Sequence, residues 1–299
     1  MAGELKLWKS LKASSQALAQ QLAGLKAVLP FKDEQWATLA LLGMLVQRDL
    51  TVRYKGSVLG NLWPLVHQLS MLLIYTYVFS IVLQVRLELK GVSGVSSDSS
   101  LMFGLWLFAG LLPWLIFNGG LQQAASAVVR QPNLVKKVVF PLSLLPLIPV
   151  FSGFLENTLG LMILIAFVAF FQHTLHITLL LLPLVWLPLL LLTTGLGYGA
   201  ASLTVFVRDI PQTIVVALNL WFYATPIIYP VAMIPEPLQQ WVFWLNPVAA
   251  IAEMYRDIIL LGEVTHWGEW AIATALSGVI FGLGFGLYRK LKVAFADVL

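Results

Sequence analysis

Long apolar stretches, separated by short groups of charged residues, make up most of the sequence. A helix needs about 20 apolar residues to cross the roughly 30 Å hydrocarbon core of a bilayer. The run from Val138 to Val207 contains a single charge, Glu156, and is too long for one helix, so we divide it near Gln172. The sequence thus predicts six transmembrane helices, over approximately residues 58–83, 101–123, 144–171, 177–204, 210–229 and 271–287.

Two shorter apolar pieces follow the fifth span, at residues 238–245 and 248–261. Prolines 235, 237 and 247 break this region, and each piece is too short to cross a membrane. Irregular backbone is tolerated at membrane depth only where protein covers it. We therefore expect two short re-entrant helices within residues 235–261, which begin and end on the same side, in an all-α membrane protein.

The basic residues are distributed unequally between the two sides of this topology. Only Arg86, Lys90 and Arg256 lie on one side. The other fifteen of the 18 Lys and Arg residues lie in the segments 1–57, 124–143, 205–211 and 288–299. Because segments rich in Lys and Arg stay in the cytoplasm, we predict that both termini are cytoplasmic.

The residues before the first span form a separate part of the chain that does not cross the membrane. In residues 1–30 a set of apolar side chains recurs at a helical period, which predicts an amphipathic helix in the membrane interface. A dimer contact or a loosely attached arm is the alternative. The apolar stretch 35–46 is too short to span and ends in charge, which also suits an interface helix. We assign residues 1–55 to a cytoplasmic arm with an interface helix, and residues 56–299 to a transmembrane domain.

Composition agrees with the pattern and excludes several kinds of chemistry. Hydrophobic residues make up 59% of the chain and charged residues 11%, whereas soluble domains contain about 25% charged residues. A net charge of +4 is too small to indicate nucleic-acid binding, and the absence of cysteine excludes disulfides and thiolate metal sites. The sequence contains no G-x-x-x-x-G-K-[ST] motif, so any ATP-driven step requires a partner ATPase.

Small residues mark two places where helices can approach closely. Gly195 and Gly199 are four residues apart in the predicted fourth span, and so are Gly282 and Gly286 in the sixth. Such pairs allow close packing of transmembrane helices, within one protomer or between two.

Five stretches occur in an order typical of one transporter family. They read RDLTVRYKGSVLGNLW from residue 48, QPNLVKKVVFPLSLLPL from 131, VRDIPQ from 207, TPIIYP from 225 and LNPVAAIAEMYRDIILLG from 245. On these stretches the chain resembles the permease subunit of an ABC-2-type polysaccharide exporter, over about residues 40–299. The ending YRKLKVAFADVL resembles the tail of the O-antigen and capsule branch. Gln68 departs from the pattern, because many members have proline there, whereas this chain has Pro64.

The resemblance implies a partner and a cargo. Such permeases have six spans, an interface helix and two re-entrant helices, and they lie in the bacterial inner membrane. Two copies pair with two cytoplasmic ATPase subunits, which bind ATP and Mg²⁺, and export a lipid-linked glycan. The permease itself is not an enzyme and has no cofactor or metal. By this analogy the loop residues Asn133, Leu134, Lys136 and Lys137 transmit the movement of the ATPase, although the two lysines can equally face lipid.

Polar and aromatic residues inside two spans are candidates for the substrate pathway, because carbohydrates bind to ring faces and hydrogen-bonding side chains. They are Trp63, His67, Gln68 and Tyr75 in the first span, and Asn219, Trp221, Phe222 and Tyr223 in the fifth. The resemblance implies that these two spans from two protomers line the pathway. Aromatic residues near span ends also serve as interface anchors, which is the alternative for Trp221 and Tyr223.

A basic and aromatic collar precedes the first span. It contains Arg48, Arg53, Tyr54 and Lys55, whose positive charge suits the phosphate of a lipid carrier. Anchoring to headgroups of the surrounding lipids is the alternative. We predict that the collar recognises the carrier headgroup and gates the cytoplasmic side.

Four charged residues lie at membrane depth or beside it. Glu156 within the third span costs roughly 2.5–3.5 kcal/mol to insert, so it should face protein or water, in substrate contact, gating or a structural hydrogen bond. Glu253, Arg256 and Asp257 on the second re-entrant helix can pair at i, i+3 or with adjacent turns. Either they gate the outer opening or they neutralise one another.

Two other functions are compatible with the composition. An ABC-2 exporter of teichoic acid, a lipid or a drug would share the same architecture. A membrane-embedded transferase would need a cluster of acids, bases or metal ligands near an interface. The four histidines are scattered along the chain, which disfavours a transferase.

Overall fold

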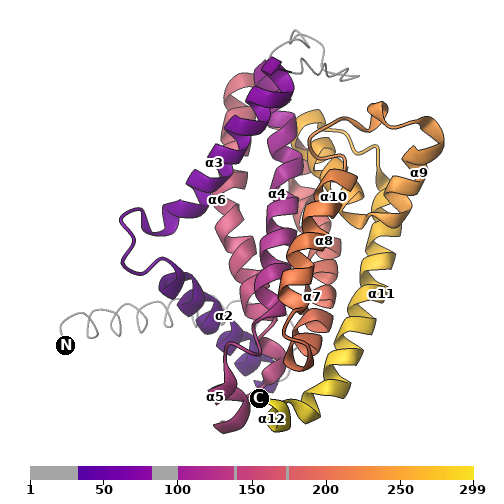
Figure 1. Cartoon of the computed structure of the whole chain (residues 1–299). Coiled ribbons are helices and arrows are strands. Elements are labelled where there is room, and N and C mark those ends of the chain that lie inside the picture. Colours follow the sequence, from indigo (N-terminus) through magenta and orange to yellow (C-terminus); the bar gives the residue numbers. More distant parts are fainter. Residues whose placement is uncertain (1–32, 83–99, 138–139, 173–174) are drawn as a thin grey trace.

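The computed structural model describes residues 33–82, 100–137, 140–172 and 175–299, and within these ranges the chain is helical without any strand (Figure 1). The predicted amphipathic helix in residues 1–30 lies outside the described residues. The α-helices are α2 (Asp33–Arg53), α3 (Trp63–Tyr75), α4 (Ser100–Ala125), α5 (Pro132–Lys137), α6 (Leu147–Gln172), α7 (Leu182–Phe206), α8 (Ile210–Ala224), α9 (Glu236–Leu245), α10 (Pro247–Arg256), α11 (Trp267–Leu291) and α12 (Phe295–Val298). Short 3-10 or π turns extend several of them, including Thr76–Val82 after α3 and Asp257–Leu261 after α10.

Four helical segments of the described chain are long and apolar enough to cross a membrane. They are Met102–Ala125, Leu142–Phe170, Ile177–Phe206 and Trp267–Val298, and the shorter Ile210–Ala224 is also apolar. These segments match the predicted second, third, fourth, sixth and fifth spans. Helix α3 and the π turn that follows it reach Val82, where the described part of the chain is interrupted.

The helix assigned to the first span begins five residues later than the hydropathy indicates. Gly56 and Gly60 have φ angles of +83° and +50°, which side chains other than glycine rarely adopt. The chain therefore turns between α2 and α3, and Pro64 occupies the first turn of α3, where proline is tolerated. Helix α2 continues past the apolar stretch 35–46 to Arg53, within the arm assigned to residues 1–55.

Helix α4 forms the centre of the bundle, and α3, α6, α7, α8 and α10 all pack against it (Figure 1). Its side chains on every face are buried, including Leu107, Ala109 and Phe117, which have no exposed surface. A helix that is apolar on all sides and surrounded by other helices needs no amphipathic pattern. The apolar surface on all sides of α4 explains why this helix can lie at the centre of the fold.

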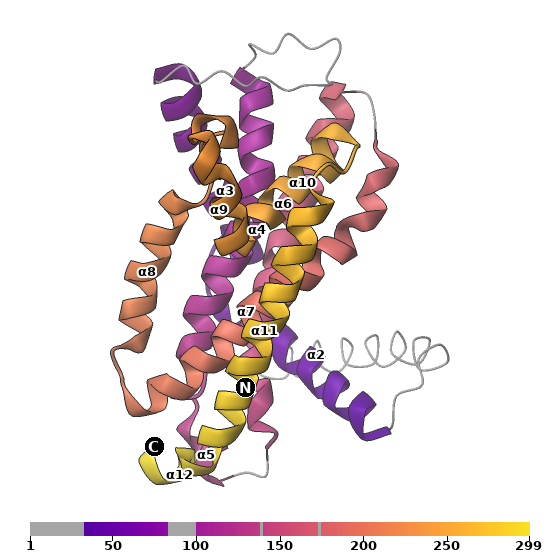
Figure 2. The same ribbon diagram turned by 90° about the vertical axis from the view of Figure 1, so that its right-hand side faces the viewer.

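Helices α7 and α11 pack backbone to backbone (Figure 2). A Cβ atom on Gly284 would collide with the carbonyl oxygen of Gly195, and a Cβ on Gly195 would lie 2.6 Å from Phe281 Cα. Gly282 and Gly286 face open space instead. Close approach in the sixth span therefore depends on Gly284 rather than on the pair that the four-residue spacing indicates.

The region after α8 contains two short helices, α9 and α10. The chain leaves α8 and enters α11 at the same end of the bundle (Figure 1). Every residue of α10 is buried, against α4, α7 and α11. Helices α2, α5 and α12 lie at the opposite end, which we call the basic end because it carries most of the described Lys and Arg residues (Figure 1).

Candidate functional site

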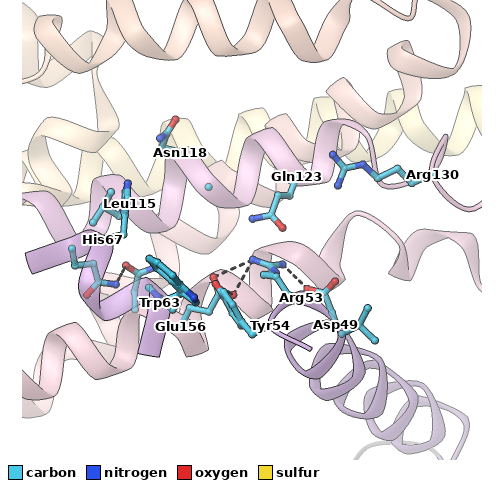
Figure 3. Close-up of a pocket in the computed structure, with 15 residues that line it drawn as sticks. Asp49, Arg53, Tyr54, Trp63, His67, Leu115, Asn118, Gln123, Arg130 and Glu156 are labelled. Carbon is cyan, nitrogen blue, oxygen red and sulfur yellow. Dashed lines mark hydrogen bonds and ion pairs between the residues drawn. The ribbon is translucent and has the colours of Figure 1, made fainter. Parts of the chain in front are cut away.

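A polar cavity of about 700 Å³ lies between the end of α2, the start of α3, and the facing sides of α4 and α6 (Figure 3). Most of its lining side chains are charged, amide-bearing or aromatic. They are Asp49, Arg53 and Tyr54 from the α2 side, Trp63, His67 and Gln68 from α3, Asn118 and Gln123 from α4, Arg130 after α4, and Glu156 and Asn157 from α6. We call this cavity the polar pocket.

Local structure explains how these side chains come together. Helix α2 ends at Arg53, so Arg53 and the next residue, Tyr54, project from its last turn. The glycine turn at residues 56–60 then reverses the chain, and α3 begins beside the end of α2. Trp63 and His67 are four residues apart on α3 and therefore share one face of the helix.

The charged centre of the polar pocket is an ion-pair network around Arg53. Nη1 of Arg53 lies 2.9 Å from Oε1 of Glu156, and its Nη2 donates a hydrogen bond to Asp49 (Figure 3). The hydroxyl of Tyr54 donates to Glu156 over 3.0 Å. The Glu156 side chain is only 12% exposed, so these contacts replace its lost hydration. Glu156 therefore forms a hydrogen-bonded ion pair with the end of α2.

The network fixes the protonation of Tyr54. Burial, and then the negative charge of Glu156, raise the pKa of the Tyr54 phenol from its ordinary value to about 12. The phenol, which is protonated at physiological pH even at its ordinary pKa, is thereby held further in the form that donates a hydrogen bond. Because Arg53 already contacts two carboxylates, it is not a free positive charge in this conformation.

Gln68 connects α3 to α6 at the inner wall of the pocket. Its side-chain amide donates to Oδ1 of Asn157 over 2.8 Å, and Asn157 in turn donates to the carbonyl of Gly153. Gln68 is 2% exposed, and its Oε1 has no hydrogen-bond partner among the described residues. The residue that departs from the family pattern therefore makes a specific polar contact between two helices.

The remaining walls supply amides and aromatic surface. Asn118 and Gln123 project from α4, and Trp63 is 46% exposed with its indole donating to Ser57 (Figure 3). Neutral amides donate and accept hydrogen bonds at once. This combination can bind a hydroxyl-rich molecule, with an aromatic face for its apolar side.

The other predicted pathway residues lie farther along the bundle. The rings of Tyr75 and Phe222 are 5.7 Å apart, so α3 and α8 meet within one chain, and Phe222 is buried. The indole of Trp221 donates to Asn246 at the start of α10. Asn219 and Tyr223 lie on the exposed face of α8.

The remaining residues of the collar and of the predicted coupling loop do not line the polar pocket. Arg48 and Lys55 are exposed at the basic end. Asn133, Leu134, Lys136 and Lys137 belong to α5, which protrudes at that end near α12 (Figure 1). Asn133 and Lys136 are exposed there.

The charged residues of α10 and of the π turn that follows it form two separate clusters. Arg256 lies 2.6 Å from Glu253, which confirms the i, i+3 pairing, and it also donates to the carbonyls of Pro226 and Ile227. Its guanidinium stacks 3.5 Å above the Trp106 ring, against Gly110, where a side chain would collide. Arg256 thereby satisfies carbonyls that the chain leaves unpaired where it unwinds after α8.

Asp257 pairs in a different way. Its carboxylate lies 2.9 Å from His266 Nδ1 and accepts hydrogen bonds from Thr265, in the turn before α11. Burial raises the pKa of Asp257, but the bonds from His266 and Thr265 outweigh it, and the net pKa is lowered. Burial lowers the pKa of His266, but the bond and charge of Asp257 outweigh it, and the net pKa is raised.

Sequence reasoning missed several residues of the site. Asn118 and Gln123 are amides within apolar spans, and this contrast is a signal that could have indicated them. Asp49 and Arg130 carry no such signal, because charges are common beside spans. No group of three or more His, Asp or Glu side chains suited to a metal ion occurs within the described ranges.

Comparisons with known proteins agree with this architecture. Residues 40–260 match the family described as ABC-2 type transporter. The chain is 28% identical to an O-antigen export system permease protein RfbA of Klebsiella pneumoniae over 261 residues, which are 87% of this chain and 95% of the relative. It is 30% identical to the protein of the same name from Myxococcus xanthus over 260 residues, which are 86% and 94% of the two chains. The chain belongs to the ABC-2 type transporter family.

Proposed function

We propose that the chain is the permease subunit of an ATP-driven exporter that moves a lipid-linked polysaccharide, of O-antigen or capsule type, across the bacterial cytoplasmic membrane. The observation that carries the proposal is the similarity to O-antigen export permeases over nearly their whole length. An aromatic and amide-lined pocket at one end of an apolar bundle supports it, because that chemistry suits sugars.

The topology proposed for this function has six spans with both termini in the cytoplasm. Helix α3 with its π extension is the first span and α8 is the fifth, in addition to the four long apolar segments. The basic end then faces the cytoplasm, as the positive-inside rule requires. Helices α9 and α10 are re-entrant from the outer side, and the complete burial of α10 supports this assignment.

In the proposed assembly two copies of the chain form a homodimer and bind two copies of a cytoplasmic ATPase, which holds ATP and Mg²⁺. Helix α5 and the exposed side of α2 contact that subunit, because both lie at the basic end. The ion pair between Arg53 and Glu156 joins α2 to the third span. A movement of α2 on ATP binding therefore reaches the wall of the polar pocket directly.

The polar pocket is the proposed receiving site for the headgroup and the first sugars of the cargo. Exposed Arg48 and Lys55 attract the phosphate of the carrier, and Arg53 becomes available to it when Glu156 is displaced. The ring of Trp63 stacks against a sugar, while Asn118 and Gln123 bind its hydroxyl groups. The glycan then continues past Tyr75, Trp221, Phe222 and Tyr223 and the nearby Asn219, between the two protomers.

The experiment that tests the function is reconstitution with the ATPase encoded beside the gene. Vesicles with both proteins and a lipid-linked glycan should hydrolyse ATP and transfer the glycan across the bilayer. An ATPase whose P-loop lysine is replaced by alanine is the control. Absence of both activities would overturn the proposal, whereas transport of teichoic acid, lipid or a drug alone would redirect it to another cargo. Glycosyl transfer by the purified chain without a partner would indicate the transferase.

A further inference from the structure

A second cavity lies on the lateral surface of the bundle, and its lining is apolar, unlike that of the polar pocket. It has a volume of about 560 Å³ and is bordered by α7, α8 and α11, with Leu121 of α4 at its inner wall. Its lining is apolar except for Thr213 and the indole of Trp221, and that indole is already bonded to Asn246. We call it the lateral groove.

The shape of the lateral groove follows from small residues. Gly195 and Gly284 bring α7 and α11 into backbone contact, which keeps bulky side chains out of this part of the floor. Ala217 on α8 and Ala200 on α7 leave the space above that floor open. On α11 the exposed Leu283 and Leu287 form the opposite rim. The result is a long apolar channel rather than a flat helical surface.

The length of the groove matches one leaflet of a bilayer. Along α8 its lining runs from Ile210 to Trp221, which at about 1.5 Å per residue is about 16 Å. Half of the roughly 30 Å hydrocarbon core is about 15 Å. The groove therefore begins at the basic end and closes near the middle of the bilayer, at the depth that the acyl chain of a single leaflet occupies.

Positive charge borders only the open end of the groove. Arg208 is exposed in the turn between α7 and α8, two residues before Ile210, with the exposed Asp209 between them. Lys290 lies one turn beyond Leu287, on the same face of α11 as Leu283 and Leu287, and is also exposed. Neither side chain forms an ion pair in the part of the chain that the structure describes. An anionic headgroup above an acyl chain in the groove would meet both.

From this complementarity we propose that the lateral groove binds an anionic phospholipid from the leaflet at the basic end, with one acyl chain between α8 and α11 and its phosphate near Arg208 and Lys290. The lipid fills the space between the two helices, so it supports α8 from the side that faces α11. The proposal requires neither the polysaccharide cargo nor the partner ATPase.

Photo-crosslinking in vesicles tests the lipid directly. The full chain carries benzoylphenylalanine in place of Leu283, in vesicles of phosphatidylcholine with phosphatidylglycerol as the minor component. We expect the lipid adducts to be enriched several-fold in phosphatidylglycerol over the bulk composition. The control position is Leu155 on α6, which is exposed but lies outside the groove, and its adducts should follow the bulk composition.

Matched charge variants keep the test specific. Arg208→Gln with Lys290→Gln should reduce the enrichment at position 283 to the bulk value, whereas Arg289→Gln with Lys292→Gln should leave it unchanged. Ala217→Trp should suppress lipid adducts by filling the groove. Bulk composition at position 283 in the unmodified background, or crosslinking of that position to a second copy of the chain, would overturn the proposal. Since the readout is a lipid adduct, it is independent of whether the chain transports glycan.

Discussion

The guanidinium of Arg53, at the last residue of α2, lies 2.9 Å from the carboxylate of Glu156 on α6, although the two residues are 103 positions apart in the sequence. This contact ties a helix at the basic end to a candidate membrane span. Neither side chain is more than 19% exposed, so the attraction is only weakly screened by solvent. The pair is therefore positioned to carry movement from α2 into the bundle.

A double-mutant cycle measures how strongly this pair couples the two helices. Arg53→Gln and Glu156→Gln each leave a charged partner partly buried, so each should lower the free energy of unfolding, while the double variant should recover part of the loss. We expect a coupling energy of about 1–3 kcal/mol from thermal or denaturant unfolding of the detergent-solubilised protein. Strictly additive effects would show that the contact carries no coupling. Arg48→Gln, an exposed neighbour on α2, is the control.

Two glycines in α11 provide a matched test of the contact with α7. Gly284→Ala places a methyl group against the carbonyl of Gly195 and should lower the free energy of unfolding by about 1–3 kcal/mol. Gly282→Ala meets open space and should leave it unchanged or raise it by up to about 1 kcal/mol, because alanine favours a helix. The comparison uses unfolding midpoints in one detergent. Equal losses in both variants would contradict the close contact.

The pair of Asp257 and His266 predicts a dependence of stability on pH. Because folding raises the pKa of His266, this histidine contributes its full stabilisation at pH values below its ordinary pKa of about 6.5. The stabilisation is lost as the pH rises through the pKa of the folded state. Because folding lowers the pKa of Asp257, this aspartate contributes its full stabilisation at pH values above its ordinary pKa of about 4. The stabilisation is lost as the pH falls through the pKa of the folded state.

Stability should therefore be greatest between about pH 4 and pH 6.5, within the window set by those ordinary values, and decline on either side of it. Unfolding midpoints measured across this range test the prediction. His266→Gln keeps a polar side chain but cannot titrate, so it should remove the decline on the alkaline side. Persistence of the same decline in that variant would assign it to another group.

Two aromatic residues test the pathway. Trp63→Ala removes a ring from the polar pocket, and Tyr223→Ala removes one from the exposed face of α8. Each should impair export without preventing assembly with the ATPase, because loss of stacking worth about 1 kcal/mol raises the glycan concentration for half-maximal transport about fivefold. Trp244→Ala, which removes an exposed ring of α9, is the control. Unchanged transport in both pathway variants would contradict the lining role.

Hydropathy and composition predicted the features of the fold that depend on the bilayer. The second, third, fourth and sixth predicted spans agree with long apolar helices, because the length of a crossing is set by membrane thickness. The start of the first predicted span was wrong by five residues. The apolar pattern continues through Gly56 and Gly60, and only their positive φ angles reveal the turn.

The contacts within the site could be predicted only in part. The pair of Glu253 and Arg256 follows from helical spacing, whereas the partners of Glu156 depend on how α2 crosses α6. In the sequence, Gln68 is only a local departure from a family pattern. In the structure its side chain bonds to Asn157, which lies 89 residues away. Local sequence indicates that a buried polar group needs a partner, and tertiary packing decides which one it finds.

The surroundings of Arg256 have a consequence for the order in which the protein is made. Among the described residues, each group that the buried guanidinium contacts precedes it in the chain: the Trp106 ring, the Pro226 and Ile227 carbonyls and the Glu253 carboxylate. During synthesis these partners have therefore already emerged when Arg256 leaves the ribosome. When α10 inserts, Glu253 can neutralise the charge of Arg256 before α11 is synthesised. The free-energy cost of burying this arginine during synthesis is therefore lower than its buried position alone would indicate.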